Sequence, residues 1–273
     1  MNRSEANEMN VGDVLREWRS RRRMSQLDLA LLAEISARHL SFVESGRASP
    51  SRDLLAKLAE QLAMPLRASN RLMLSAGYAP AYEEPSYDAP EMATIRTTVQ
   101  TVLDGHLPFP AITIDRHWTL VQANAAAAQL FQEIDPALLA PPLNVLRISF
   151  HPQGLAPRIV NLVEWRHHVL ERLQQQFDGS GDPFLSELRS ELIALSAKNN
   201  QRPHPNISTD PMLAVPLELR MPGSDRVMRF ISTTTVFSTA TSVTVSELAM
   251  ECFYPADQET RDALLHPEKD TSR

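Results

Sequence analysis

Residues 25–46 read SQLDLALLAEISARHLSFVESG, two short helical patterns separated by only a few residues. Ser25 begins the first pattern and forms an S-x-x-D capping box with Asp28. Ser36 begins the second, which ends at Gly46, the residue type expected just after a helix. Isolated helices shorter than about 12–15 residues are marginal in water. Both helices must therefore be stabilised by packing against neighbouring elements.

Further short helices are predicted on both sides of this pair. Residues 11–22 place Val14, Leu15 and Trp18 at helical spacing. A fourth helix is predicted to begin near Ser49-Pro50-Ser51, and a fifth covers residues 66–76 and stops at Gly77. The sequence therefore predicts an all-α, five-helix domain over residues 11–78.

The helix predicted over residues 36–45 has two different sides. At about 100° per residue, Leu40 and Val43 share one side. The opposite side carries Arg38, Ser41, Phe42 and Ser45. A recognition helix of a helix-turn-helix needs this division, with an apolar inner face and an outer face that can reach base edges. Ala30 is small enough for close helix crossing, and Ile35 can fill the elbow under the turn.

The pattern resembles the Xre/Cro-type helix-turn-helix superfamily. The residues that carry the resemblance are Ser25, Gln26, Leu29, Ala30, Ile35, Ser36, Leu40, Val43, Glu44, Gly46, Pro50, Leu54 and Leu55. It implies that Gln26 and Ser36 contact backbone phosphates, that Ala37, Arg38 and Ser41 face the major groove, and that Phe42 lies at its edge. It also implies that Arg19 pairs with Glu44 as scaffold rather than as a DNA contact.

Several roles on this surface stay open. Arg38 can bind guanine O6 and N7 bidentately, or it can be a solvated arginine on an exposed helix. Phe42 can meet a thymine methyl, or it can pack against the fourth helix or a dimer partner. His39 is either a backbone contact or an inert surface histidine, and Arg47 is a candidate phosphate contact. The run 21–23, all arginine, either steers DNA or simply solvates a helix end.

Composition limits the class of protein. The chain has 273 residues, which suggests about two domains, and its net charge is −6. Residues 1–78 hold 12 basic and 9 acidic residues, whereas the remainder holds 15 and 24. A basic head on an acidic body hints at a polyanionic partner for the head, although random scatter of surface charge is the alternative. With Cys252 as the single cysteine and no signal-peptide or membrane pattern, we expect a cytoplasmic protein.

The rest of the chain predicts an antiparallel sheet with helices packed on one side. A helix over about 91–103 leads into a hairpin over 111–123, and Asn124 caps a short helix. Two helices follow, one starting just after Pro157 and one over 182–198. Three strand candidates end the chain, MLAVPLELR (212–220), RVMRFISTTTVF (226–237) and TSVTVSELAMECFY (241–254).

This body resembles the ligand-binding domain of MmyB-like transcriptional regulators, a PAS-like fold attached to an Xre-type head. The matching stretches are LMLSAGYAPAY (72–82), LPFPAITIDRHWTLVQANAAA (107–127) and PPLNVLRISFHPQGLAPRIVNLVEWRHHVLERL (141–173). The resemblance implies an α+β fold with a five-stranded antiparallel sheet, and a small apolar effector, with a fatty acid as the best candidate. Arg147, His151 and Trp165 lie in the most family-like run and are nominated as ligand contacts. The alternative is that His151-Pro152 forms a turn and Trp165 is an ordinary core residue.

No catalytic or metal site is predicted. His167 and His168 are adjacent on a helix and so point in different directions, which is a poor arrangement for joint metal binding. Cys252 lies in a strand pattern and is expected to behave as a buried small hydrophobe. The sequence contains no P-loop, zinc-ligand spacing or G-x-S-x-G motif. Haem sensing through a histidine has no distinguishing spacing in its favour.

We therefore expect a homodimeric, non-enzymatic regulator that binds operator DNA and, through its body, a small apolar effector, with no other cofactor and no membrane association. The alternative is a repressor whose body serves only dimerisation or protein interaction. The predicted boundaries are a flexible tail (1–10), the DNA-binding domain (11–78), a linker (79–92), the PAS-like domain (93–256) and a C-terminal tail (257–273).

Overall fold

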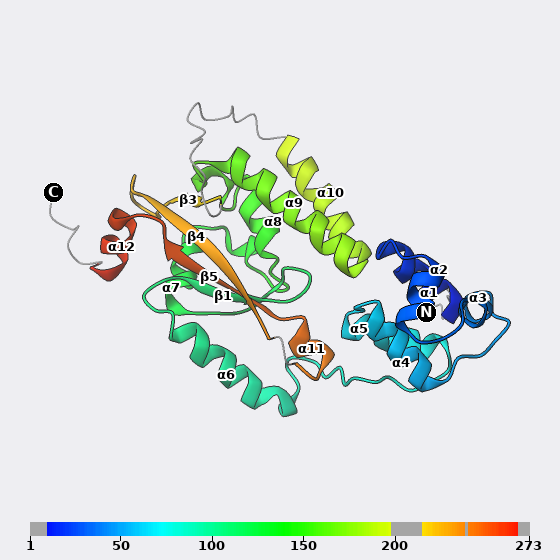
Figure 1. The fold of residues 1–273 in the computed structure, drawn as a ribbon. Coiled ribbons are helices and arrows are strands. Elements are labelled where there is room, and N and C mark those ends of the chain that lie inside the picture. The colour runs from blue at the N-terminus through cyan, green and yellow to red at the C-terminus, as the bar shows by residue number, and fades with distance from the viewer. Residues whose placement is uncertain (1–9, 198–214, 238–239, 267–273) are drawn as a thin grey trace. The chain divides into compact units, whose positions relative to one another are not determined.

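The structure is a computed structural model that describes residues 10–197, 215–237 and 240–266 (Figure 1). Two compact units make up the fold. The first comprises Met1–Pro85, Asp178–Gly181 and Ala240–Ser246, and the second comprises Ser86–Phe177, Asp182–Thr239 and Glu247–Arg273. Two short segments from within the second half of the sequence thus belong to the same unit as the N-terminal helices.

Five helices form the N-terminal part, as predicted. They are α1 (Val11–Arg21), α2 (Gln26–Leu32), α3 (Ala37–Glu44), α4 (Arg52–Gln61) and α5 (Leu66–Ser75). The capping box between Ser25 and Asp28 is present, and Ser36 caps α3. Gly46 adopts a φ of +72°, a left-handed conformation that glycine enters without steric cost. The local stop and start signals were therefore interpreted correctly.

One apolar core holds these short helices together. Its fully buried members come from all five helices and include Leu15, Leu29, Leu40, Leu55 and Leu72. Burying a leucine contributes roughly 1.5–3 kcal/mol. Helices of 7 to 11 residues are therefore stabilised by contacts with one another rather than by their own propensity.

The segment after α5 is fastened to the helix by one buried amide. Asn70 is only 4% exposed. Its Oδ1 accepts hydrogen bonds from the backbone N–H groups of Ala81 (2.9 Å) and Tyr82 (3.0 Å), and its Nδ2 donates to the Tyr82 carbonyl (2.8 Å). Because all three bonds are to backbone, they fix the path of the chain rather than a particular side chain.

The second unit contains a five-stranded sheet in the order β2-β1-β5-β4-β3, with every neighbouring pair antiparallel (Figure 1). The strands are β1 (Ala111–Ile114), β2 (Leu120–Ala123), β3 (Leu217–Arg220), β4 (Val227–Val236) and β5 (Ala249–Pro255). The predicted α+β class, with an antiparallel five-stranded PAS-like sheet, is confirmed.

The helical elements of the rest of the chain follow in sequence order. They are η1 (Pro90–Met92), α6 (Ala93–Asp104), α7 (Ala125–Leu130), η2 (Pro136–Leu138), α8 (Val145–Phe150), η3 (Ala156–Arg158), α9 (Leu162–Ser180), α10 (Pro183–Ala197), α11 (Val243–Ser246) and α12 (Gln258–Leu265). Residues 258–265, which the sequence analysis assigned to a tail, form α12, and its Ala263 and Leu264 pack on the core.

Helices cover both faces of the sheet, so the expectation of helices on one side is wrong. Ile112 and Ile114 of β1 pack in a cluster with residues of α8, α9 and α10. Ala111, which faces the other way, packs with Val99 and Leu103 of α6. Strand β1 shows the reason. All four of its residues are buried, whereas a strand covered on one face only would alternate between buried and exposed residues.

Two further expectations need correction. Residues 243–246 were predicted as the start of a strand but form the short helix α11, and β5 begins only at Ala249. The long helix begins at Leu162, not just after Pro157, because Ile159 forms a β-bridge with Leu219. Residues 212–214 of the third strand candidate lie outside the described residues.

Candidate DNA-binding and effector-binding sites

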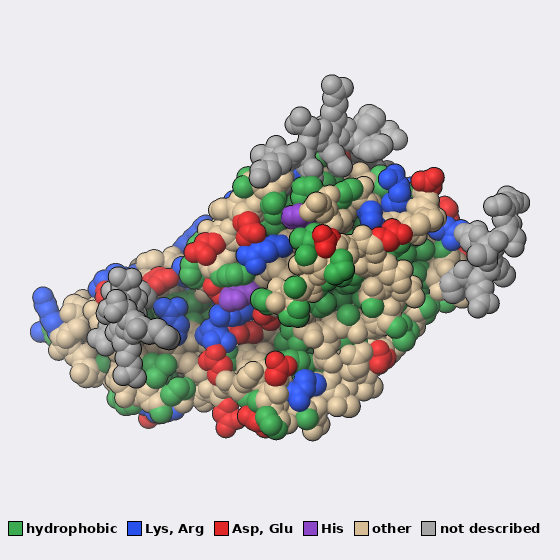
Figure 2. Space-filling model, turned by 180° about the vertical axis from the view of Figure 1, so that it is seen from behind, with side chains coloured by type: hydrophobic (Ala, Val, Ile, Leu, Met, Phe, Trp, Pro, Cys, Tyr) green, Lys and Arg blue, Asp and Glu red, His purple; other side chains and the backbone are tan. Residues whose placement is uncertain are grey.

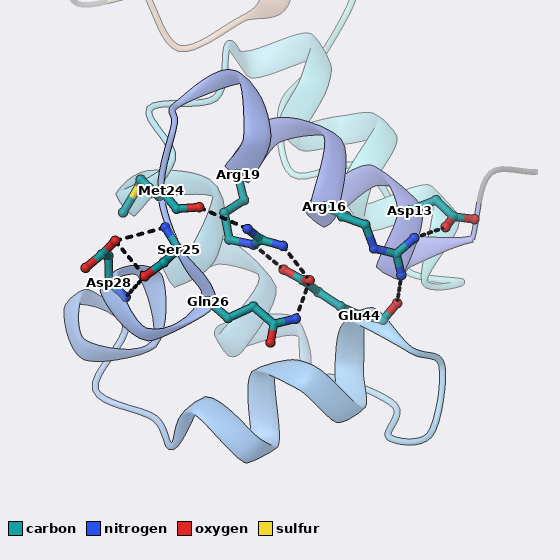
Figure 3. A network of polar contacts seen from close by, with 8 residues as sticks. All are labelled: Asp13, Arg16, Arg19, Met24, Ser25, Gln26, Asp28 and Glu44. Atoms are coloured by element: carbon teal, nitrogen blue, oxygen red, sulfur yellow. Dashed lines mark hydrogen bonds and ion pairs between the residues drawn. The ribbon is translucent and has the colours of Figure 1, made fainter.

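A buried carboxylate joins the three helices of the candidate DNA-binding surface (Figure 3). Glu44, at the end of α3, is 2% exposed. Its Oε1 accepts from the Nε of Arg19 on α1 (2.7 Å), and its Oε2 accepts from the Nη2 of the same guanidinium (3.0 Å) and from the Nε2 of Gln26 on α2 (2.8 Å). The predicted pairing of Arg19 with Glu44 is confirmed, and Gln26 belongs to the same network.

Arginines of α1 also bind backbone carbonyls of the neighbouring segments. The Nη2 of Arg16 donates to the Glu44 carbonyl (2.7 Å), and its Nη1 donates to Asp13 (2.9 Å). The Nη1 of Arg19 donates to the Met24 carbonyl (2.9 Å) just before the Ser25 cap (Figure 3). These arginines of α1 therefore have a structural role, since Arg19 holds the backbone just before α2 and Arg16 holds the backbone at the end of α3.

The charges of this network stabilise one another. Burial disfavours the ionised form of Glu44, but the hydrogen bonds from Arg19 and Gln26 outweigh it and hold the pKa of this carboxyl below its ordinary value. The hydrogen bond to Glu44 in turn raises the pKa of Arg19. The pair is therefore ionised at neutral pH, and charged hydrogen bonds of this kind are among the stronger ones in proteins.

Gly12 lets α1 approach the end of α3. A Cβ placed on Gly12 would lie 2.2 Å from the carbonyl oxygen of Glu44. Real atoms do not approach so closely, so only glycine fits while this carbonyl accepts from Arg16. Neither Gly12 nor Arg16 could be recognised from the sequence, because neither shows its importance until α1 is packed on α3.

The outer side of α3 presents its first turn to solvent. Ser36 is exposed, and its Oγ accepts from the backbone N–H of His39 (3.1 Å). The first backbone N–H groups of a helix have no acceptor within the helix, and anions are favoured at such an N-terminus. Arg38 is exposed and Ser41 is half-buried, whereas Ala37 packs partly against the core. Ala37 therefore sits closer to the core than the resemblance implies.

Phe42 lies between two arginines. The guanidinium of Arg38 is 5.3 Å from the centroid of its ring, and that of Arg47 is 6.0 Å away. Both distances are within the range of cation–π attraction. In the described part of the chain, Phe42 is not among the residues packed on the core of the five helices. The aromatic ring therefore lies close enough to attract two exposed guanidinium groups. The sequence alone did not indicate this role.

Charge on one face of the molecule is mixed. On the face that Figure 2 shows, acidic and basic side chains are interspersed with apolar ones rather than gathered by sign. On that face a polyanion would meet no broad basic field.

The three nominated ligand contacts all have neighbours within the second unit. Arg147 is exposed and forms a bidentate ion pair with Glu191, with distances of 2.8–3.0 Å. His151 ends α8, and its Nδ1 accepts from the backbone N–H of Gln153 (3.1 Å) in a turn. Trp165 is half-buried and packs 5.6 Å from Phe150, ring centre to ring centre. Arg147 and His151 thus have partners within the protein, and Trp165 contacts the core.

Chemistry typical of an active site is not prominent among the described residues. Burial, together with the neighbouring Glu251, raises the pKa of the Cys252 thiol, which disfavours the thiolate that nucleophilic catalysis needs. His167 is exposed and pairs with Glu171 at 3.1 Å on its own helix. In the described ranges, no group of three or more histidine, cysteine or acidic side chains is arranged to hold a metal ion.

Comparison with protein families assigns both parts of the chain. A helix-turn-helix family model matches residues 15–68, which contain α2, α3 and the Glu44 network. The model of the MmyB-like transcription regulator ligand binding domain matches residues 95–265, more than half of the chain. The chain belongs to the MmyB-like transcription regulators. A search of curated proteins gives no match.

As an MmyB-like regulator, the chain combines a DNA-binding helix-turn-helix with a ligand-binding domain. The ligand-binding match runs to residue 265 and so includes α12. Among the described helices of this regulator, none combines the length and apolar character that a membrane crossing requires.

Proposed function

We propose that this regulator is a homodimer that recognises a specific operator through α3 and changes its operator affinity when its PAS-like domain binds a small apolar effector. The observation that carries the proposal is the buried Glu44 network, because it fixes α3 against α1 and α2 and leaves one side of α3 exposed. A single head reaches only a half-site, so pairing two heads doubles the contacts. The proposed location is the cytoplasm, where the DNA is.

The proposed DNA contacts divide into two kinds. Arg38 and Ser41 are assigned to base edges, with Ala37 and Phe42 beside them. Gln26, Ser36 and Arg47 are assigned to phosphates. Gln26 can serve both the scaffold and DNA, because its amide has a second N–H and a carbonyl oxygen besides the N–H that binds Glu44. In this proposal residues 11–78 bind DNA, 79–92 link, and the domain from residue 93 binds the effector.

Arg38 provides the test of sequence recognition. A guanidinium that binds a guanine contributes about 1–3 kcal/mol of discrimination. Arg38→Ala should therefore relax the preference at one base position in a gel-shift titration against a library of promoter fragments. Arg71→Ala is the matched control, because it removes the same charge from an exposed position on α5.

Two results would contradict this assignment. An equal loss of affinity for every sequence would make Arg38 a phosphate contact, as would a smaller dependence of binding on salt. Absence of any sequence preference in the unmodified protein would contradict the operator proposal as a whole.

The effector proposal has its own test. An apolar effector, with a fatty acid as the first candidate, should appear in native mass spectrometry of the purified regulator as a reproducible added mass of lipid size. A second candidate, a body that only dimerises, predicts paired chains without added mass. The family model supports the effector reading, since the matched domain is described as ligand-binding. No catalytic step is proposed.

A further inference from the structure

Strand β4 is longer than its neighbour β3, and this leaves part of the sheet edge open (Figure 1). β4 has 10 residues, and β3 pairs only with residues 227–230. On its other side β4 pairs with β5 as far as Val236. Among the described residues, the outer edge of 231–236 therefore has no neighbouring strand.

Backbone segments do bond to both terminal strands of the sheet. The N–H of Leu120 in β2 donates to the Leu143 carbonyl (2.7 Å), and the carbonyl of Glu218 in β3 accepts from the N–H of Val160 (2.8 Å). Open edges are otherwise protected by charged residues, proline or a bulge. Residues 231–236 read ISTTTV, and their register with β5 is continuous. This stretch thus has none of the usual protections against pairing with another strand.

The register shows which backbone groups the open edge presents. The Arg229 carbonyl accepts from the N–H of Ala256 (2.8 Å), on the β5 side of β4. Because the direction alternates along a strand, Ser232, Thr234 and Val236 point their N–H and C=O groups away from β5. Within the described chain these backbone groups have no hydrogen-bond partner. The open edge therefore offers three donors and three acceptors in a regular row.

Side-chain contacts hold the middle of this edge in place. The Nη2 of Arg172 on α9 donates to the Thr234 Oγ1 (2.7 Å), which donates to Glu251 Oε1 (2.8 Å). Arg172 is also ion-paired with Glu251, which is 3% exposed on β5. The Thr234 hydroxyl is thus used inside the protein, and the nearby cation is compensated. An edge held in this way loses little conformational freedom when another strand binds it.

We propose that residues 231–236 pair with the same residues of a second copy, antiparallel and about a two-fold axis at Thr234. This register places Thr234 opposite the partner's Thr234, and Ser232 opposite the partner's Val236. All three outward-pointing residues then exchange backbone hydrogen bonds with the partner. The inference rests on the proposed homodimer and gives it an interface.

A second copy fits this edge because the edge is self-complementary. A two-fold interface joins the same patch on both subunits, so every group must tolerate its own symmetry partner. Residues 231–236 carry no charge, so no like charges meet across the axis. Most of them are β-branched, which favours a strand. Val236, 59% exposed in one chain, would lie beside the partner strand.

Disulfide cross-linking tests the register. The variants are made in a Cys252→Ala background, because Cys252 lies opposite Thr233 on β5. Thr234→Cys should oxidise to a cross-linked dimer, since residues opposite each other in a hydrogen-bonded pair have Cα atoms about 5.5 Å apart. Ser232→Cys and Val236→Cys are matched controls. Each lies roughly 14 Å from its own symmetry copy and should stay unlinked alone, whereas a mixture of the two should cross-link.

Weakening the edge tests the interface without cysteines. Ser232→Pro removes an outward N–H, and Val236→Lys places a charge on the edge. Each should raise the dissociation constant of the dimer at least about 10-fold in sedimentation equilibrium, because symmetry makes each substitution act twice. Val102→Lys is the control, since Val102 is 48% exposed on α6, and it should leave the dissociation constant unchanged.

The outcomes separate the interface from the homodimer itself. A dimer that is unaffected by both Ser232→Pro and Val236→Lys would overturn the interface and leave the homodimer standing, as would cross-linking of Ser232→Cys alone. Occupation of this edge by another segment of the same chain gives the first of these results. A single-chain mass of the unmodified protein at every concentration, with and without an operator fragment, would overturn both. Gel shifts show separately whether operator binding stands.

Discussion

At the scale of single residues, Glu44 determines how the DNA-binding surface is presented. Its carboxylate is buried and receives three hydrogen bonds from two other helices. Removing one partner of a buried ion pair leaves the other charge uncompensated, which costs more than the pair itself contributes. The orientation of α3 therefore depends on a group that is almost completely buried.

The first prediction concerns the pH dependence of this contact. Because the pKa of Glu44 is lowered in the folded protein, its contribution is complete above the ordinary carboxyl pKa and is lost as pH falls through the lowered value. Glu44→Gln should reduce the free energy of unfolding of the five-helix part by about 2–3 kcal/mol at pH 7. The difference should shrink as the pH is lowered, because the natural side chain then becomes neutral too. Urea unfolding at a series of pH values measures both effects.

Glu17→Gln is the matched control. Glu17 pairs with Arg21 on the surface of α1, where an ion pair contributes little. Its effect should stay within a few tenths of a kcal/mol and show little dependence on pH. A Glu44→Gln variant as stable as the unmodified protein at pH 7 would contradict the role assigned to this carboxylate.

Sequence patterns and the family resemblance identified some of these residues but not others. Arg19 and Glu44 could be paired in advance because their positions match a known helix-turn-helix pattern, and the geometry confirms the pair. Gly12 lies in the first predicted helix, yet its need to be glycine depends on the Glu44 carbonyl that faces it from α3. Periodicity gives the side of a helix on which a residue lies, and tertiary packing alone gives its neighbours.

At the scale of elements, caps were predictable and packing surfaces were less so. Ser25, Ser36 and Ser51 act as N-caps because their side chains bond to backbone groups within three residues. Asn124 was likewise foreseen as the cap of α7, and its Oδ1 accepts from Ala127 at 2.9 Å. Its other bonds, to the carbonyls of Leu103 and Phe109, join segments far apart in sequence and were not predictable.

Residues 243–246 show why one predicted strand became a helix. Alternating valines favour a strand, but Val243 is fully buried and its N–H donates to the Glu83 carbonyl (2.8 Å). Ser242 then accepts from the backbone N–H of Ser246 through its carbonyl (3.1 Å). A contact with a segment about 160 positions earlier in the chain thus overrides local β propensity.

The second prediction tests the close approach of α1 to α3. Gly12→Ala should destabilise the five-helix part by about 1–3 kcal/mol, because the added Cβ meets the Glu44 carbonyl oxygen. An exposed glycine in a helix normally behaves in the opposite way, since alanine stabilises it by about 0.5–1 kcal/mol. Gly179 of α9 is half-buried but has nothing within 4 Å of an added Cβ, so alanine should be tolerated there in the same way.

Thermal unfolding of Gly12→Ala and Gly179→Ala compares the two sites directly. The first variant should have a lower melting temperature than the unmodified protein, and the second a higher one. A rise for both variants would show that α1 can move away from α3 at no cost, and the close packing would then have no consequence.

At the scale of the whole molecule, the chain passes repeatedly between its two units. It leaves one unit for the other after residues 85, 177, 181, 239 and 246. If the two domains were joined by a single linker, the chain would pass from one to the other only once. The ligand-binding domain is therefore covalently continuous with the helix-turn-helix unit at several points, since α9 ends within residues 178–180 of that unit and β5 follows α11.

The last prediction concerns coupling between effector and operator. If dodecanoate, a fatty acid of the proposed effector class, changes operator affinity by some factor, operator DNA must change dodecanoate affinity by the same factor, because the two binding free energies belong to one closed cycle. Couplings of this kind are typically about 5- to 150-fold. Titrating dodecanoate into the regulator with and without a saturating operator fragment, and the fragment with and without dodecanoate, measures both sides. A regulator whose operator affinity shifts with dodecanoate while its dodecanoate affinity ignores the operator would violate the cycle. The fatty acid would then be acting on the DNA or on an aggregate rather than through the ligand-binding domain.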